Sequence, residues 1–390
     1  MKVRNTGNKI PLFDLSVSPT AKREVAATLT SGWLTTGSRV AAFEKAIGDL
    51  TKVRYAAAVS SATAGLQLAL IAVDNGRDAD VITTPFTFVA TLEAIVAAGC
   101  RPVLADINPV TLNIDPDEVA RKVSRRTRAV IPVDIAGYPA DYQGLNDVCD
   151  KWSVPVIADA AHSFGASYKN RSIPALADAA VFSFYSTKNL TCGEGGMVVS
   201  RHKELVEEVQ CLARHGLTSN AFRRKPASEW KYDATQPGFK ANMSDIHAAV
   251  GLGQLGVFEK EQKRREKLAI RYLKNLTDLS EHLELPIIQK HYNHAWHLFI
   301  IKLHLSSLKI DRNRFIHLMA ERGVECGVHY QPVFELSYYR ECLDLSPQYF
   351  PNTAYAGRRV VSLPMFPTLK AKDVDYVCDC VIDILRKNAR

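Results

Sequence analysis

Residues 156–197 have the sequence VIADAAHSFGASYKNRSIPALADAAVFSFYSTKNLTCGEGGM, and this stretch decides the fold. Two apolar runs, 155–158 and 179–184, are rich in Val, Ile, Phe and Ala and are bounded by turn residues. Such runs predict buried strands of an α/β sheet. The first run ends on Asp159 and the second leads to Lys188. Because ligands bind at the carboxyl ends of strands in these sheets, we expect one carboxylate and one amine at the same edge.

A buried lysine and a nearby aspartate suggest a specific chemistry. Burial disfavours the charged form of a lysine, so its amine becomes a usable nucleophile, most often for Schiff bases. A cofactor held as a lysine Schiff base, with an aspartate paired to its pyridinium nitrogen, is the arrangement for pyridoxal 5′-phosphate (PLP). Taken alone, Lys188 and Asp159 could also be ordinary residues at the ends of two strands.

A PLP site also needs a place for the phosphate, and residues 60–65 (SSATAG) are candidates. They stand between a predicted strand, 55–59, and an apolar helix that continues from Leu66. Small hydroxyl residues suit a helix N-cap, whose free N–H groups and dipole attract an anion. Ser183 could add a hydroxyl group to the same anion. The alternative is a capped helix without a ligand.

An aromatic side chain is expected to face the cofactor ring. Residues 84–91 (TPFTFVAT) follow the apolar pair at 81–82, where a strand leads into a helix. An aromatic residue at such a position can stack on a flat heteroaromatic ring. We choose Phe88 over Phe86 for this role, although both could be core residues.

Together these segments resemble a known family. The chain is similar to the sugar aminotransferases that act on nucleotide-linked keto-sugars (the DegT/DnrJ/EryC type), a branch of the fold-type I PLP enzymes. The resemblance extends from residues 32–37 (GWLTTG) to 363–367 (LPMFP). Ordered matches of this kind are far more specific than any single motif. Its markers are SSATAGLQLAL (60–70), TPFTFVAT (84–91), IADAAHSFGA (157–166), FSFYSTKNL (182–190), GEGG (193–196), KANMSDIHAAVGLGQL (240–255), AWHLFIIKL (295–303) and GVHYQPV (327–333).

The resemblance implies a role for each candidate residue around the cofactor ring. Lys188 would form the Schiff base and then act as the general acid and base. Asp159 would keep the pyridinium nitrogen protonated, so that the ring can take up electrons. Phe88 would stack on one face of the ring, and His162 would approach the ring or its phenolic oxygen.

The resemblance also implies roles in binding the phosphate and the substrate. Ala62 and Thr63 would present backbone N–H groups to the phosphate, and Ser183 a hydroxyl group. Asn242 would reach the phosphate of the neighbouring subunit's cofactor, which implies a homodimer with shared active sites. Its local alternative is a helix-capping residue. The expected substrate-binding residues are Thr35, Tyr185, His329 and Tyr330.

The chain departs from the family pattern at two positions. Many relatives have His where this chain has Asp134, and they often have Gln in place of His162. Asp134 could therefore change contacts near the cofactor or the substrate. A metal site is not expected, because the histidines at 291, 294 and 297 have no convincing metal-ligand spacing with a Cys partner.

Composition limits the class of protein and its partners. Hydrophobic residues make up 47% of the 390 residues and charged residues 23%, as in soluble globular enzymes. We expect no membrane span and no secretory signal. The eight cysteines form no CxxC pair, which favours free thiols in a reducing cytoplasm. The net charge of +8 is spread among acidic residues, so we expect no nucleic-acid binding but a mild attraction for a phosphorylated nucleotide.

The predicted architecture is α/β, with an N-terminal arm (1–14), a large PLP-binding domain (15–250) and a connecting helix with a small α+β domain (251–390). The large domain should contain a mainly parallel sheet of seven strands covered on both faces. Residues 219–230 have no periodicity and predict a loop near the active site. The expected strands of the large domain are 54–59, 81–84, 102–106, 129–133, 155–158, 179–184 and 197–200. A helix should span about 243–275, and the small domain should have strands at 296–303 and 324–329 and helices at 312–322 and 371–387.

The expected function is transfer of an amino group from L-glutamate to a nucleotide-diphosphate keto-sugar, with a UDP-linked 4-keto sugar preferred. The product would enter a surface polysaccharide, a lipopolysaccharide or another glycan. Two alternatives are open. A sugar dehydratase of the same family would typically have His in place of Lys188, and a non-catalytic PLP-binding regulator would usually carry an added helix-turn-helix domain. The sequence does not name the sugar, the ring carbon or the nucleotide.

Overall fold

The structure is a computed structural model, and it describes residues 9–73, 79–217 and 232–390. Most of the predicted N-terminal arm and the whole predicted loop at 219–230 lie outside these ranges. The described end of the arm runs beside the C-terminal part of the chain, where Ile10 forms a parallel bridge with Val324.

In the described part of the chain, seven strands form the central sheet, as the sequence predicts. A four-stranded and a three-stranded sheet are joined by parallel bridges from Val130 to Val156 and from Val133 to Asp159. Of these seven described strands, only β9 runs antiparallel to its neighbours. The fold is therefore that of the fold-type I enzymes, with a mainly parallel sheet. In spatial order the strands are β1 (Tyr55–Val59), β9 (Gly196–Ser200), β8 (Ala179–Ser183), β5 (Ile157–Asp159), β4 (Thr127–Val130), β2 (Asp80–Thr83) and β3 (Arg101–Leu104).

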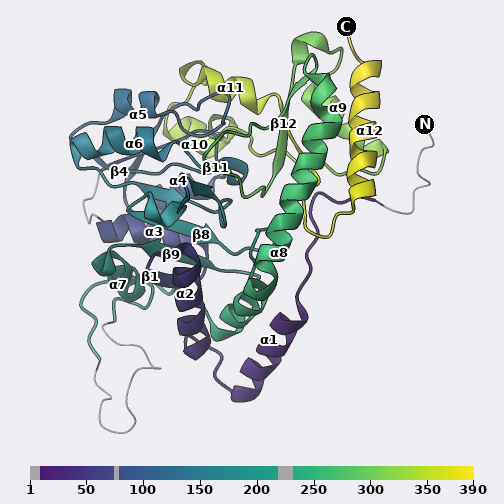
Figure 1. The fold of residues 1–390 in the computed structure, drawn as a ribbon. Coiled ribbons are helices and arrows are strands. Elements are labelled where there is room, and N and C mark those ends of the chain that lie inside the picture. The colour runs from purple at the N-terminus through teal and green to yellow at the C-terminus, as the bar shows by residue number, and fades with distance from the viewer. Residues whose placement is uncertain (1–8, 74–78, 218–231) are drawn as a thin grey trace.

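Helices cover both faces of this sheet (Figure 1). Alternate residues of a strand point to opposite faces, and here Ala180 and Phe182 enter one core while Ala179 and Val181 enter the other. Both faces are apolar because both are buried. Of the described helices, none is long and apolar enough to cross a membrane. The helices of this part are α1 (Pro19–Ser31), α2 (Ser38–Thr51), α3 (Ala62–Val73), α4 (Ala90–Ala97), α5 (Pro116–Lys122), α6 (Tyr142–Cys149) and α7 (Lys203–Leu212).

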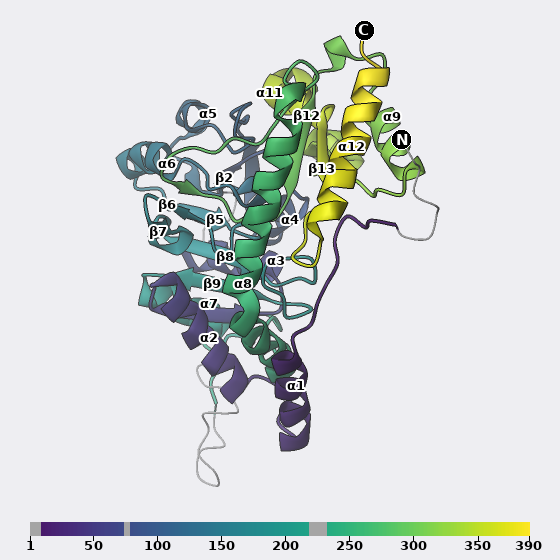
Figure 2. The ribbon, with the colours of Figure 1, turned by 45° about the vertical axis from the view of Figure 1, so that its right-hand side comes forward.

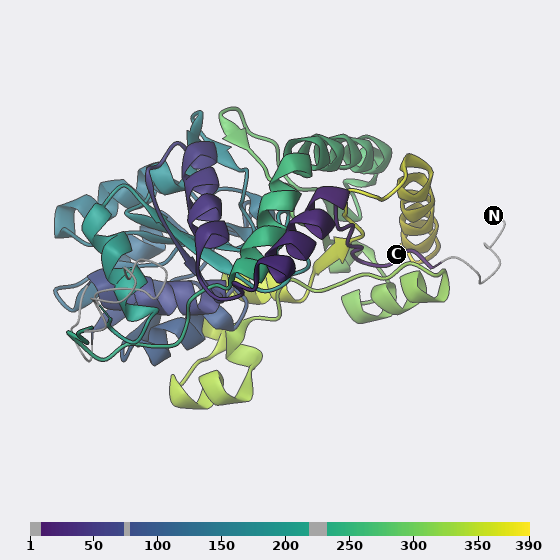
Figure 3. The same cartoon turned by 90° about the horizontal axis from the view of Figure 1, so that it is seen from below.

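The long helix α8 (Asp245–Leu276) joins the two parts of the molecule (Figures 2 and 3). Ala248 and Phe258 pack in the core beside the central sheet, whereas Leu268 and Tyr272 pack in a separate C-terminal core. The helix agrees with the predicted 243–275. The division into domains at residue 250 stays a prediction. The remaining helices and strands are β6 (Ser167–Tyr168), β7 (Arg171–Ser172), β10 (Leu283–Glu284), β11 (Tyr292–Asn293), β12 (Phe299–Leu303), α9 (Arg312–Glu321), α10 (Ser337–Cys342), α11 (Pro351–Gly357), β13 (Val360–Leu363) and α12 (Ala371–Lys387).

One predicted strand of the C-terminal part is wrong. Residues 324–329, all of them described, form only isolated bridges, at Val324 and at Gly327. Gly327 exchanges two backbone hydrogen bonds with Ser362 of β13, at 3.0 and 2.8 Å. Beyond this contact the chain leaves the sheet and brings His329 and Tyr330 to the pocket described below. The third strand of this sheet is instead β13, in the order β10-β12-β13.

The packing of α1 on α8 depends on the absence of a side chain at Gly253. A Cβ atom added there would overlap the backbone N and Cα of Ala21. The close approach lets the Ser18 hydroxyl, which caps α1, donate to the Gly253 carbonyl at 2.8 Å. Gly256, one turn further along the same helix, would place a Cβ in open space.

We predict opposite effects of alanine at these two glycines. Gly253→Ala should lower the free energy of unfolding by about 1–3 kcal/mol, because α1 must move away. Gly256→Ala should raise it by about 0.5–1 kcal/mol, because alanine is the better helix former. Urea unfolding of both variants at one protein concentration measures the difference. Equal effects of the two substitutions would contradict the close packing of α1 on α8.

Candidate active site

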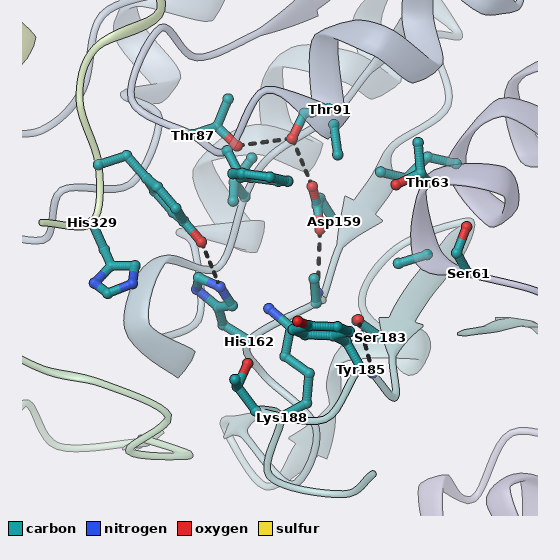
Figure 4. A pocket seen from close by; sticks show the side chains of 18 of the residues that line it. Ser61, Thr63, Thr87, Thr91, Asp159, His162, Ser183, Tyr185, Lys188 and His329 are labelled. Carbon is teal, nitrogen blue, oxygen red and sulfur yellow. Dashed lines mark hydrogen bonds between the residues drawn. The ribbon is translucent and has the colours of Figure 1, made fainter. Parts of the chain in front are cut away.

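A pocket of about 480 Å³ lies at the carboxyl ends of β5 and β8. Figure 4 shows the side chains that surround it, including Asp159 and Lys188. The pocket brings together segments from both parts of the chain. In the described ranges, Thr35 and Asn242 lie outside its lining. The candidate residues that line it are Ala62, Thr63, Phe88, Asp159, His162, Ser183, Tyr185, Lys188, His329 and Tyr330.

Lys188 lies on the loop that leaves β8. The loop turns back at once: the Lys188 backbone N–H donates to the Tyr185 carbonyl at 2.9 Å, and Phe184 donates to Gly195 at 2.9 Å. The lysine keeps some accessible surface because it faces the pocket, but protein atoms surround it closely. Burial lowers the pKa of its amine from 10.5 to about 8, and the nearby Asp159 charge opposes this shift. About a tenth of the amine is therefore neutral at pH 7, far more than for an ordinary lysine, and only the neutral amine is a nucleophile.

Asp159 is the last residue of β5 and is only 6% exposed. Its carboxylate accepts hydrogen bonds from the Thr91 hydroxyl at 2.8 Å and from the Ala161 backbone N–H at 3.2 Å. Burial raises the pKa of this carboxyl, whereas the hydrogen bonds from Thr91 and Ala161 and the charge of Lys188 lower it. The sequence did not indicate the Thr91 contact, which joins segments 68 residues apart.

His162 is held between aromatic groups from the C-terminal part. Its Nε2 atom lies 2.8 Å from the Tyr330 hydroxyl, and its ring centre lies 4.4 Å from that of His297. His297 in turn lies 3.2 Å from the side-chain oxygen of Asn189, the residue after Lys188. Burial lowers the pKa of His162 well below its usual range, so the ring is neutral. Its Nδ1 atom is buried and has no hydrogen-bond partner among the described residues.

The first turn of α3 forms one wall of the pocket. Ser61 precedes the helix, and its hydroxyl accepts a hydrogen bond from the Ala64 N–H at 3.1 Å. The N–H groups of Ala62 and Thr63, at the start of the helix, have no carbonyl partner within it. Gly196 makes room for this turn, since a Cβ there would stand 2.7 Å from the Ala62 nitrogen. Free N–H groups at a helix N-terminus are donors suited to an anion, and the Ser183 hydroxyl lines the same pocket.

The structure separates the two phenylalanines of the 84–91 segment. Phe86 is fully buried in a core cluster, whereas Phe88 is 57% exposed and lines the pocket. The ring centre of Phe88 lies 5.9 Å from that of Tyr330. The choice of Phe88 as the pocket aromatic agrees with this placement.

Asp134, for which the sequence left open a change of contacts near the cofactor or the substrate, does not line the pocket. It is fully buried and accepts hydrogen bonds from the Ser163 hydroxyl at 2.6 Å and the Tyr142 hydroxyl at 3.0 Å. Burial raises the pKa of its carboxyl to about 7. Through its hydrogen bond with Ser163, Asp134 thus stabilises the turn after His162 without itself lining the pocket.

Two functional-site features were missed from the sequence. Thr87 lies before α4 and Thr91 in its first turn, and both line the pocket; the signal for them was two hydroxyl residues in the segment 84–91 that was expected to face the ring. His297 lies behind His162 and was assigned only to a strand or loop. Among the described residues, no group of three His, Cys, Asp or Glu side chains could hold a metal ion.

The residues of the pocket fit PLP. A buried carboxylate, a partly neutral amine, a helix N-terminus beside a serine hydroxyl and an exposed aromatic ring all face one cavity. The unpartnered Nδ1 atom of His162 is a further polar group that a ligand could satisfy, because buried polar atoms are rarely left without a partner. This donor set defines the class of fold-type I PLP enzymes.

Comparison with known proteins identifies the family. The model of the DegT/DnrJ/EryC1/StrS aminotransferase family matches residues 16–382. The spore coat polysaccharide biosynthesis protein SpsC of Bacillus subtilis is 38% identical over 366 residues, which cover 93% of this chain and 94% of SpsC. The chain belongs to this family of PLP-dependent sugar aminotransferases.

Solved structures give the same result. The sugar aminotransferase Spr1654 of Streptococcus pneumoniae has been solved in a pyridoxamine phosphate form and a PLP form. Its structure matches this one with a TM-score of 0.90 and 28% sequence identity, and the match covers 97% of this chain and 99% of Spr1654. PseC of Helicobacter pylori, an aminotransferase of pseudaminic acid biosynthesis, has a TM-score of 0.90 and 26% identity, covering 97% and 100%. The protein is thus a PLP-dependent transferase.

The lowered pKa of Lys188 predicts how PLP uptake depends on pH. Only the neutral amine reacts with an aldehyde, so the rate of uptake by the PLP-free protein should rise with pH and level off above about 8. An ordinary lysine amine would gain reactivity up to its pKa of 10.5. Stopped-flow absorbance measures the rate, with Lys188→Ala as the control for other lysines. A rate that keeps rising well beyond pH 8 would show that Lys188 is not desolvated as described.

Proposed function

We propose that this enzyme transfers the amino group of L-glutamate to the ketone of a nucleotide-diphosphate sugar, with a UDP-linked 4-keto sugar as the preferred acceptor. The observation that carries the proposal is the placement of Asp159 and Lys188, at the carboxyl ends of adjacent parallel strands in one pocket. Membership of the sugar aminotransferase family supports the keto-sugar as the substrate class.

We assign the pocket residues as follows. PLP, when bound, supplies the electron sink for amino-group transfer. Asp159 would accept a hydrogen bond from the protonated ring nitrogen, and Lys188 would bind the cofactor and then serve as the general acid and base that carries the proton. Phe88 would cover one face of the ring, and His162 would approach the ring or its phenolic oxygen.

The phosphate would be held by neutral donors. The N–H groups of Ala62 and Thr63 and the Ser183 hydroxyl are assigned to it, with support from the α3 helix dipole. Tyr185, His329 and Tyr330 are assigned to the substrate. Tyr185 is 46% exposed, which suits a residue that meets a large sugar nucleotide at the mouth of the pocket. Tyr330 would act in part through His162, to which its hydroxyl is hydrogen-bonded.

The proposal extends to the pathway and the compartment. SpsC is named for spore coat polysaccharide and PseC for pseudaminic acid, so we propose a surface polysaccharide, lipopolysaccharide or glycan as the destination of the amino sugar. We propose a cytoplasmic location. All eight cysteines are free thiols, which a reducing compartment preserves, and the proposed sugar-nucleotide substrate also suits this compartment. The net charge of +8 favours an anionic nucleotide.

We predict that a panel of keto-sugar nucleotides will separate the finer alternatives. With L-glutamate as donor, a UDP-linked 4-keto sugar should be turned over faster than its dTDP- and GDP-linked counterparts. Production of 2-oxoglutarate and of the amino sugar is measured, with Lys188→Ala as the inactive control. Amination of none of the panel, or activity that survives in Lys188→Ala, would contradict the proposal.

We further propose a homodimer in which Asn242 and Thr35 complete the partner's site. The cap of α8 is Ser244, whose hydroxyl accepts from the His247 N–H at 3.3 Å, so Asn242 is not needed as a capping residue. The Asn242 side-chain NH₂ donates to the Thr36 hydroxyl at 2.6 Å, beside the exposed Thr35. Trp33 and Leu34 next to it are 39% and 43% exposed, which supports an interface there.

Subunit mixing tests the shared site. Lys188→Ala and Asn242→Ala should each be inactive at a PLP concentration that leaves Asn242→Ala unloaded, because an amide–phosphate hydrogen bond contributes about 1.5–3 kcal/mol. In a mixed dimer with crossed sites, one site has both defects and the other has neither. Activity should return to about a quarter of the wild-type value after random exchange. Absence of recovery in mixtures shown to exchange subunits would mean that each chain builds its own phosphate site.

A further inference from the structure

Two buried threonines lead from the wall of the pocket to Asp159. Thr91, in the first turn of α4, donates its hydroxyl hydrogen to the Asp159 carboxylate at 2.8 Å. The hydroxyl oxygens of Thr87 and Thr91 are 2.8 Å apart. Figure 4 shows the three side chains in one continuous hydrogen-bonded row. Thr87 and Thr91 are 2% and 1% exposed, so bulk water does not compete for these bonds.

The direction of the row follows from the chemistry of its end. An ionised carboxylate only accepts hydrogen bonds, so Thr91 must be the donor to Asp159. The single hydrogen of the Thr91 hydroxyl is then used, and Thr91 can only accept from Thr87. Both hydroxyl dipoles therefore point toward Asp159. Hydrogen bonds in such a chain polarise one another, which strengthens the last bond of the row.

The row opposes the cost of keeping Asp159 ionised. Burial raises the pKa of this carboxyl, and the hydrogen bond from Thr91 is the largest of the effects that lower it, ahead of the Ala161 N–H and the charge of Lys188. The charge of Lys188 is lost whenever its amine is neutral. The threonine hydroxyls are a fixed contribution that does not change during the reaction.

We infer that Thr91 is a positioning residue that keeps Asp159 ionised and aimed at the ring nitrogen of PLP, and that Thr87 orients Thr91. The inference rests on the proposed placement of that nitrogen at Asp159. Phe88 lies between the two threonines in sequence, so one short segment, residues 87–91, both covers the ring and fixes the carboxylate. Thr91 acts through Asp159 and is not itself assigned a contact with PLP.

The test compares Thr91→Val with a matched control. Thr83 is also fully buried, and its hydroxyl donates at 2.8 Å to the Ile131 carbonyl, away from the pocket lining. Thr83→Val thus removes the same group at the same depth. Asp159→Asn serves as the reference for loss of the carboxylate. The readouts are the NMR shift of the isotope-labelled ring nitrogen of bound PLP, which reports its protonation, and the PLP dissociation constant.

We predict that Thr91→Val will move the ring-nitrogen signal toward the unprotonated position seen in Asp159→Asn. The PLP dissociation constant should rise about tenfold, which corresponds to about 1.4 kcal/mol. Thr91→Ser should restore both values, and Thr83→Val should change neither. Thr87→Val should have a smaller effect in the same direction and none when added to Thr91→Val, because it acts through the same bond.

The outcomes separate this inference from the proposal on which it rests. If Asp159→Asn leaves the nitrogen signal unchanged, the proposed placement of the ring nitrogen is wrong, and the inference falls with it. If Asp159→Asn moves the signal but Thr91→Val does not, the threonine row has only a packing role. Loss of stability in Thr91→Val without a spectroscopic change would likewise contradict a positioning role for Thr91.

Discussion

The parallel pairing of β5 with β8 is the constraint on which the site depends. Asp159 stands opposite Val181 in this pair, and the ladder continues through a hydrogen bond from the Ala160 N–H to the Val181 carbonyl at 3.0 Å. Asp159 and Lys188 therefore meet at one end of a sheet that is buried on both faces. Burial disfavours the charge of each, raising the pKa of the carboxyl and lowering that of the amine. The opposite charge of its neighbour only partly offsets this cost.

Other residues of the pocket offset the free-energy cost of burying the charges of Asp159 and Lys188. Asp159 receives fixed donors from Thr91 and Ala161. His162 is neutral and is held by Tyr330 and His297, both from the C-terminal part of the chain. The site thus needs residues from both parts of the chain, although Asp159 and Lys188 come from a single stretch of 42 residues, 156–197. Asp134, buried behind the turn, orients Ser163 and has no contact with the cavity.

Local sequence patterns were enough for the central sheet and for the residues at its edge. Each apolar run that predicted a strand of the large domain contains or overlaps an observed one, because a strand buried on both faces must be apolar throughout. The same logic placed Asp159, Lys188 and Ser183 at strand ends. It failed at residues 324–329, where an apolar, β-prone pattern was taken for a strand although the chain turns away after Gly327.

Contacts between segments far apart in the sequence could not be predicted from local sequence patterns. The Thr91–Asp159 and Tyr330–His162 hydrogen bonds join residues 68 and 168 positions apart, and no periodicity within either segment encodes the other. The substrate-binding role of Thr35 and the role of Asn242 in the site of a neighbouring subunit stay predictions. For the same reason the sequence left open what Asp134 contacts, since its hydrogen-bond partners Ser163 and Tyr142 become evident only in the structure.

The central claim is that Lys188 is the residue that binds PLP. Reduction of the PLP-loaded protein with borohydride, followed by peptide mass spectrometry, fixes the cofactor to whichever lysine holds it. The account predicts one modified peptide, with the phosphopyridoxyl group on Lys188. The cofactor on any other lysine, or a Lys188 peptide that stays unmodified in fully loaded protein, would contradict it.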